Sequence, residues 1–183
     1  LYHLAPTGKA GFVLSKGSLT SKTNTEGEIR KALIENDLVD CIVNLPTKLF
    51  LNTQIPACLW FLSRNKTNGG FRERKGEILF IDARNKGELI SRKNRVLTDE
   101  DYYKEKGIEN KTGDIEEITS IYHNWRKKGG NFEDVPGFAK SASIDDVKKL
   151  NYVLTPGRYV GLPDDEDDFD LEEGVKKLET ELE

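Results

Sequence analysis

The chain has 183 residues, of which 36% are hydrophobic and 33% are charged. This length supports a hydrophobic core without a disulfide or metal staple, and the aromatic and aliphatic content excludes a disordered chain. No apolar run approaches the roughly 20 residues that a membrane-spanning helix needs.

The net charge of −4 is unevenly distributed along the chain. Residues 164–183 carry eleven acids and two lysines, whereas residues 64–95 carry ten Arg or Lys and four acids. A stretch of net charge +6 attracts phosphate backbones, although scattered Lys and Arg also simply solvate a surface. The basic stretch therefore indicates nucleic-acid contact without establishing it.

Two further features concern the chain's origin. It contains no methionine and begins Leu1-Tyr2-His3, so we expect it to be a piece of a longer protein. The N-terminal residues have no signal-peptide pattern. Cys41 and Cys58 lie in apolar runs far from either histidine, which predicts buried thiols, no metal site and a reducing, cytoplasmic compartment.

Apolar runs and helical periodicity predict an alternation of strands and helices. Strands are expected at 10–15, 38–45, 57–62 and 77–82, and helices at 26–36, 114–128 and 144–150. Continuous apolar strands separated by a helix predict an α/β sheet covered on both faces. Because only about eleven residues connect the second and third strands, these two strands should be antiparallel.

Several local expectations accompany these elements. The first strand should be buried, Thr25 and Glu28 should form a capping box, and Ser143 should cap the last helix. Residues 83–97 should be irregular and 152–160 extended. Trp125 should be a core residue.

Motifs for catalysis are missing from the sequence: there is no nucleophile elbow, phosphate loop or paired His and Cys set. Several segments nevertheless resemble, in order, the modification (methyltransferase) subunit of type I restriction-modification systems. The segments are 27–34, 43–50 (VNLPTKLF), 53–57 (TQIPA), 78–84 (ILFIDAR), 97–98, 121–126 (IYHNWR) and 152–160 (YVLTPGRYV).

The resemblance implies transfer of a methyl group from S-adenosylmethionine to N6 of adenine in double-stranded DNA. It implies the C-terminal part of a Rossmann-like methyltransferase sheet with an antiparallel last strand pair, plus a C-terminal helical extension. The family's Gly-rich cofactor turn and its Asn-Pro-Pro-aromatic motif do not occur in these residues. We therefore expect an inactive fragment, with no catalytic or cofactor-binding residue of its own and the cofactor bound upstream.

One element of the active site is implied by the resemblance. Phe50 matches the aromatic that stacks on a flipped-out adenine in similar enzymes, although an apolar residue capping the sheet is the alternative. Lys48, Arg72, Arg74 and Lys75 are candidate contacts to DNA, although exposed basic side chains are commonly only solvated.

The expected organisation has three parts: the methyltransferase portion at 1–97, a family-specific extension at 98–163, and an acidic linker with a partner helix at 164–183. The helix carries an apolar stripe that is expected to dock on the specificity subunit. The alternative is that this stripe folds back on the same domain. The stripe consists of Leu171, Val175, Leu178 and Leu182. The restriction subunit is the other partner that the resemblance implies.

Three interpretations stay open at this point. The chain is part of a methyltransferase subunit, a non-catalytic module that binds DNA and partner subunits, or a degenerate methyltransferase-like fold. The truncated sheet should leave the outer side of strand 10–15 unprotected, so we also expect self-association or a loop folded over that edge.

Overall fold

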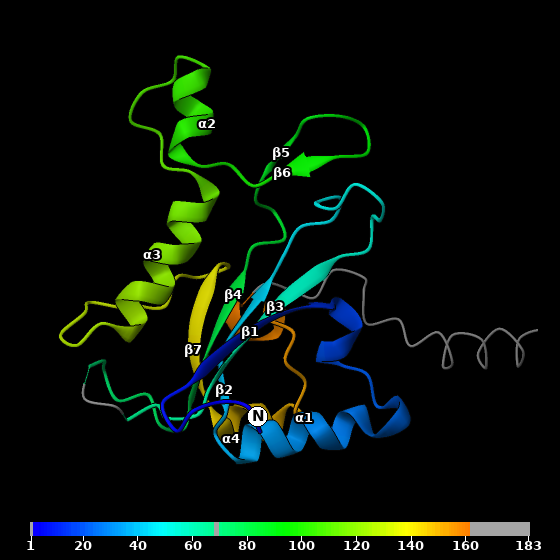
Figure 1. The fold of residues 1–183 in the computed structure, drawn as a ribbon, viewed down its shortest axis with the longest axis vertical. Helices are drawn as coiled ribbons and strands as arrows, with labels where there is room; N and C mark the ends of the chain where they lie inside the picture. The colour runs from blue at the N-terminus through cyan, green and yellow to red at the C-terminus, as the bar shows by residue number, and fades with distance from the viewer. Residues whose placement is uncertain (1, 68–69, 162–183) are drawn as a thin grey trace, which may run out of the picture.

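The computed structural model describes residues 2–67 and 70–161, which form a sheet with helices packed on both faces (Figure 1). The strands are β1 (Lys9–Ser15), β2 (Val39–Asn44), β3 (Ala57–Ser63), β4 (Glu77–Asp82), β5 (Glu88–Leu89), β6 (Arg95–Val96) and β7 (Ala139–Ser143). The helices are α1 (Glu26–Glu35), α2 (Glu100–Glu105), α3 (Asp114–Arg126), α4 (Ile144–Lys149) and α5 (Gly157–Val160). Short 3₁₀ turns, η1 (Lys16–Leu19) and η2 (Thr23–Thr25), precede α1.

The main sheet has five strands in the order β1-β3-β2-β4-β7. β3 runs antiparallel to both β1 and β2, β2 and β4 are parallel, and β7 is antiparallel to β4. The antiparallel β2–β3 pair confirms the prediction made from the short connection between them. Residues after 97 contribute to this same sheet through β7, whereas the expected domain boundary at 97 stays a prediction.

Every residue of β2 is buried because helices cover both of its faces. On one face, Ile34 of α1, Val147 of α4 and Tyr159 of α5 pack with the strand residues Ile42 and Phe80. The rings of Phe80 and Tyr159 are stacked with centroids 3.7 Å apart.

The opposite face of the sheet is covered by α3. Trp125 is fully buried there, and its indole N–H donates to Ser141 Oγ at 2.9 Å, which satisfies the one polar atom of the side chain. The predicted helix and its core tryptophan are thereby confirmed. The Ser143 cap of α4 is confirmed too, because Ser143 Oγ accepts from the Asp146 N–H at 3.1 Å.

The start of the chain differs from expectation. β1 forms as predicted but is not buried, and Phe12, Val13 and Leu14 are 47%, 58% and 43% exposed. The strand lies at the edge of the sheet, and no helix covers it among the described residues. The expected capping box is wrong, because Thr25 has a φ of 66° and its side chain makes no cap hydrogen bond.

Two other stretches contain structure that the sequence did not predict. Residues 83–97 were expected to be irregular, yet they form the β5–β6 hairpin. The stretch 152–160 was expected to be extended but ends in α5, which follows Pro156 at a φ of −55°. A proline ring is compatible with the first turn of a helix, so this sequence starts a helix instead of a turn.

The two cysteines are buried and unpaired, as predicted. Burial raises the pKa of both thiols, which makes them poor nucleophiles at neutral pH. Within the described ranges, no helix is both long and apolar enough to cross a bilayer.

Candidate nucleic-acid interface

The loop between β2 and β3, residues 45–56, lies at the carboxyl end of β2. Pro46 ends the ladder because it has no N–H to donate. Leu49 packs against the core under α3, while its neighbour Phe50 is 41% exposed. The loop thus anchors one apolar side chain and presents the next one to solvent.

Hydrogen bonds within the loop hold this geometry. Phe50 and Thr53 form an isolated antiparallel bridge, and the Ile55 N–H donates to Thr53 Oγ1 at 3.1 Å. Leu51 and Ile55 of the same loop are also exposed, at 86% and 63%. Several exposed apolar side chains on one loop make this loop a candidate binding surface.

The β5–β6 hairpin packs against this loop (Figure 1). The Arg95 N–H donates to the Lys48 carbonyl at 2.8 Å, and Lys48 Nζ donates to the Arg92 carbonyl at 3.3 Å. The structure therefore places Lys48 and Phe50 together and adds the hairpin, which was not predicted from the sequence. The available signal was the polar run 91–94 between the short apolar pairs Leu89-Ile90 and Val96-Leu97.

The other candidate DNA contacts lie elsewhere. Arg72, Arg74 and Lys75 precede β4, at the end of the sheet opposite to the β2–β3 loop. A strand of six residues spans about 20 Å, so the structure does not bring these residues together with Phe50. Arg72 is engaged with Glu77, whose carboxylate accepts from Nη1 at 3.0 Å and Nη2 at 2.7 Å.

Arg74 is a structural residue and not a surface cation. Its side chain is 1% exposed, and Nε donates to Asp40 Oδ1 at 3.3 Å. The phenol of Tyr122 donates to the other oxygen of the same carboxylate at 2.9 Å, and burial, followed by the charge on Asp40, raises the pKa of that phenol. A side chain enclosed in this way cannot reach a phosphate. The prediction that Arg74 contacts DNA is therefore wrong.

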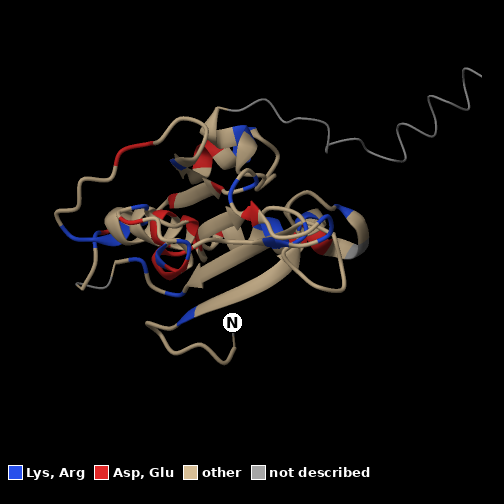
Figure 2. Cartoon of the chain, turned by 90° about the horizontal axis from the view of Figure 1, so that it is seen from above, with Lys and Arg blue, Asp and Glu red and all other residues tan. Residues whose placement is uncertain are grey.

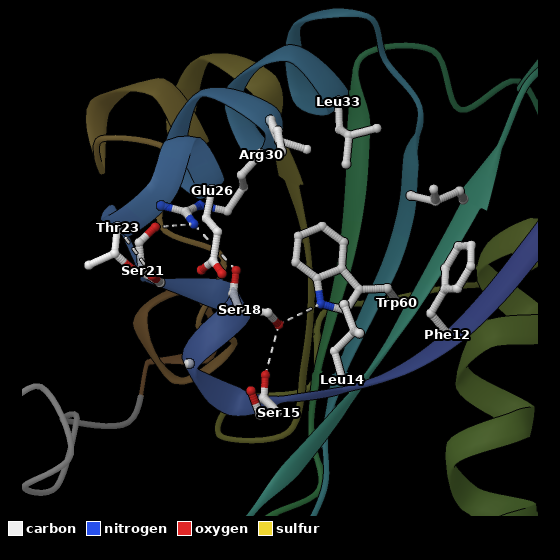
Figure 3. A pocket seen from close by; sticks show the side chains of 13 residues that line it. Phe12, Leu14, Ser15, Ser18, Ser21, Thr23, Glu26, Arg30, Leu33 and Trp60 are labelled. Atoms are coloured by element: carbon white, nitrogen blue, oxygen red, sulfur yellow. Dashed lines mark hydrogen bonds between the residues drawn. The ribbon is translucent and has the colours of Figure 1, made fainter. Parts of the chain in front are cut away.

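A groove lies between α1 and the outer strands β1 and β3 (Figure 3). It has a volume of about 730 Å³, and Phe12, Ile29, Leu33 and Trp60 contribute to its apolar lining. Leu33 of α1 is partly buried against the core, whereas Ile29, one turn earlier on the same helix, is 57% exposed. The apolar side of α1 is therefore covered by the core only in part, and its outer portion lines the groove.

Comparison with known proteins gives the family. The model of the N-6 DNA Methylase family matches residues 1–168, which is most of the chain. This chain belongs to the N-6 DNA methylase family.

Relatives of this N-6 DNA methylase chain include two methylase subunits of type I restriction enzymes. The HindI methylase subunit of Haemophilus influenzae is 49% identical over 168 residues, which are 92% of this chain and 33% of that protein. The MjaIX methylase subunit of Methanocaldococcus jannaschii is 44% identical over 186 residues, which are 100% of this chain and 30% of that protein. The chain thus spans about one third of the length of these relatives.

Solved structures agree with this assignment. The methyltransferase subunit of a type I restriction-modification system from Streptococcus thermophilus is 31% identical, with a TM-score of 0.67 over 88% of this chain and 28% of that chain. The mixed sheet with helices on both faces is therefore that of a type I methyltransferase subunit. A Rossmann-like methyltransferase fold is consistent with it.

The described residues of this N-6 DNA methylase chain do not fit the cofactor that the family implies. The turn after β1 is a 3₁₀ helix with one glycine, Gly17, in place of a Gly-rich phosphate or cofactor turn. Arg30, the buried cation beside the groove, donates to backbone carbonyls, with Nη1 2.8 Å from the Ser21 oxygen. Of the carboxylates at or next to the ends of β2 and β4, Asp40 is paired with Arg74, Glu77 with Arg72 and Asp82 with Arg84.

We therefore predict that residues 1–183 alone do not bind S-adenosylmethionine. Isothermal titration calorimetry of the purified 183-residue chain should give no binding heat at micromolar concentrations of the chain and the cofactor. A one-to-one isotherm with a micromolar dissociation constant would contradict this prediction. The longer gene product that contains these residues is the positive control.

Proposed function

We propose that this chain is part of the modification subunit of a type I restriction-modification system, a site-specific DNA adenine-N6 methyltransferase. The observation that carries the proposal is an exposed aromatic residue, Phe50, on an ordered loop at one end of a methyltransferase sheet. The chain alone is inactive, because its residues include neither a Gly-rich cofactor turn nor an Asn-Pro-Pro-aromatic motif. S-adenosylmethionine then binds to another part of the same subunit.

In this proposal, Phe50 stacks on the extruded adenine. A base that leaves the duplex loses its stacking partners, and an aromatic ring returns about 1–3 kcal/mol per base. The exposed side chain of Phe50 offers a ring face without any rearrangement of the core. Lys48, two residues earlier, supplies a cation for the neighbouring DNA backbone.

The open edge of the sheet supports a second role, the docking of other protein segments. β1 pairs with β3 on one side only within the described residues, and in Figure 2 the strand next to the N-terminus runs along one edge of the molecule with almost no charge on it. An unpaired apolar edge is a template for another strand. We propose that the remainder of the subunit covers this edge and the adjoining groove, and that without it the chain self-associates.

The partners of the assembly follow from the same proposal. They are double-stranded DNA, the specificity subunit and the restriction subunit, in the cytoplasm, where the free thiols of Cys41 and Cys58 stay reduced. The stripe proposed to dock on the specificity subunit lies in 171–183, outside the described residues, and stays a prediction.

Methyl transfer tests the proposal. The full-length gene product that contains these residues, purified with its specificity subunit, is incubated with unmethylated DNA and S-adenosylmethionine. Mass spectrometry of the digested DNA should show N6-methyladenine and no methylcytosine. Methylation of another base, or none with any DNA in the presence of the specificity subunit, would contradict the proposed function and favour the docking module.

A further inference from the structure

The tip of the β5–β6 hairpin is a defined turn that presents two cations. The Ile90 N–H donates to the Asn94 carbonyl at 3.0 Å, and Ser91 Oγ accepts from the N–H groups of Lys93 and Asn94 at 3.3 and 3.0 Å. Arg92 and Lys93 occupy the two central positions of this turn and are exposed. They are therefore held at the point of the hairpin that projects furthest from its base.

The base of the hairpin is fixed as well. Arg95 Nη1 donates to the carbonyls of Lys86 and Gly87 at 2.8 and 3.0 Å. Gly87 has a φ of 83°, and a Cβ at this position would lie 2.6 Å from the Val96 carbonyl oxygen, so only glycine allows the two strands to approach this closely. The hairpin is thus built as an ordered element and not as a loose basic loop.

Lys48 joins the hairpin to the base-stacking loop. Its backbone carbonyl accepts from the Arg95 N–H and its ammonium donates to the Arg92 carbonyl, so the two segments bond at two places. Lys48 has a φ of 68°, a left-handed conformation that is uncommon for a residue with a side chain. The connection positions the cations of the tip relative to Phe50.

Most charges around the hairpin are already paired. Arg84 pairs with Asp82 and Lys86 with Glu117, at 2.9 and 2.6 Å. Glu88 is the only acid between residues 84 and 96. Its carboxylate accepts hydrogen bonds from the Tyr102 hydroxyl of α2 and from the ammonium of Lys106, which follows α2. Within residues 2–67 and 70–161, the side chains of Arg92 and Lys93 make no ion pair with an acid, which leaves them available to an external anion.

We infer that Arg92 and Lys93, with Lys48, bind phosphates of the DNA backbone next to the extruded adenine. The inference rests on the proposed function, because the anion is identified by the base-stacking residue to which the hairpin is bonded. Extruding a base rotates its backbone, so cations fixed beside the stacking ring would hold the rotated strand. The hairpin then acts as a clamp with no role in reading the sequence.

The test removes two charges at the tip of the hairpin. The variant Arg92→Gln with Lys93→Gln is made in the full-length protein and purified with the specificity subunit. The matched control is Lys127→Gln with Lys128→Gln, which removes the same charge from an exposed site after α3, at the opposite end of the sheet beside Arg72. DNA affinity is measured from 50 to 300 mM salt.

We expect the slope of log K against log salt to decrease in magnitude by about 1.8 for the hairpin variant, or about 0.9 per lost phosphate contact. The control variant should keep the slope of the wild type. An unchanged slope for the hairpin variant, or an equal decrease in both variants, overturns the clamp.

Methyl transfer by the wild-type protein separates the two proposals. If the wild type methylates adenine while the hairpin variant keeps its salt slope, the clamp is wrong and the proposed function stands. If the wild type binds DNA with the expected slope difference but methylates nothing, the proposed function is wrong and the hairpin is a DNA-binding element of a non-catalytic module.

Discussion

Asp40→Ala is expected to lower the free energy of unfolding of the chain by about 3–5 kcal/mol. Asp40 and Arg74 are each 1% exposed, and their ion pair connects β2 to the loop before β4. Removing the carboxylate leaves a buried guanidinium without a counter-charge, and Arg74 Nη2 already lacks a hydrogen-bond partner within the described residues. The Tyr122 phenol also loses its acceptor.

Urea unfolding of the wild type and the variants measures this effect. Tyr122→Phe is the matched control, since it removes one hydrogen bond to the same carboxylate and should cost about 1 kcal/mol. The double variant Asp40→Ala with Arg74→Met should be more stable than Asp40→Ala alone, because it also removes the buried guanidinium that has lost its counter-charge. Equal midpoints for Asp40→Ala and wild type would show that the pair does not stabilise the fold.

Phe50→Ala is expected to reduce kcat/KM for methyl transfer by the full-length protein roughly 5- to 150-fold, which corresponds to about 1–3 kcal/mol of lost stacking. The affinity for S-adenosylmethionine should stay unchanged, because the residues that bind it lie elsewhere. Steady-state kinetics with a duplex containing the target site measures the loss. Phe50→Trp, which keeps a ring, should retain most of the activity.

Leu51→Ala is the matched control for this experiment. Leu51 is 86% exposed on the same loop, so its truncation removes apolar surface beside Phe50 but no aromatic face. It should leave kcat/KM within a few-fold of the wild type. Equal activity of Phe50→Ala and the wild type would exclude base stacking at this position.

The strands β1 to β4 were predictable because each is a short, continuous apolar run with β-branched or aromatic residues. The apolar run 38–45 predicted β2 with an error of one residue at each end. The short connection that contains Pro46 and Pro56 predicted that β3 pairs with β2 in the antiparallel direction. The exposure of β1 could not be predicted in the same way. An apolar composition predicts a buried strand, whereas burial depends on which elements pack on the strand, and β1 is an exposed edge strand in the part of the chain that the structure describes.

The candidate site was predictable only in part. The position of Phe50 between two apolar strands placed it on an end of the sheet, but its base-stacking role came from the family resemblance and stays a prediction. The hairpin was missed because each of its strands has two residues, too few for a period-2 pattern. Arg74 was misassigned because its buried partner, Asp40, is 34 residues away in the sequence.

Photocrosslinking tests most directly whether Phe50 receives the extruded base. A duplex carries 5-iodouracil in place of the adenine that the full-length protein methylates, because this base forms a bond with an aromatic ring stacked on it under ultraviolet light. Mass spectrometry of the digested complex should locate the crosslink at Phe50, and Phe50→Ala should abolish it. A crosslink found only at residues away from the β2–β3 loop, with full yield in Phe50→Ala, would contradict the role assigned to this loop.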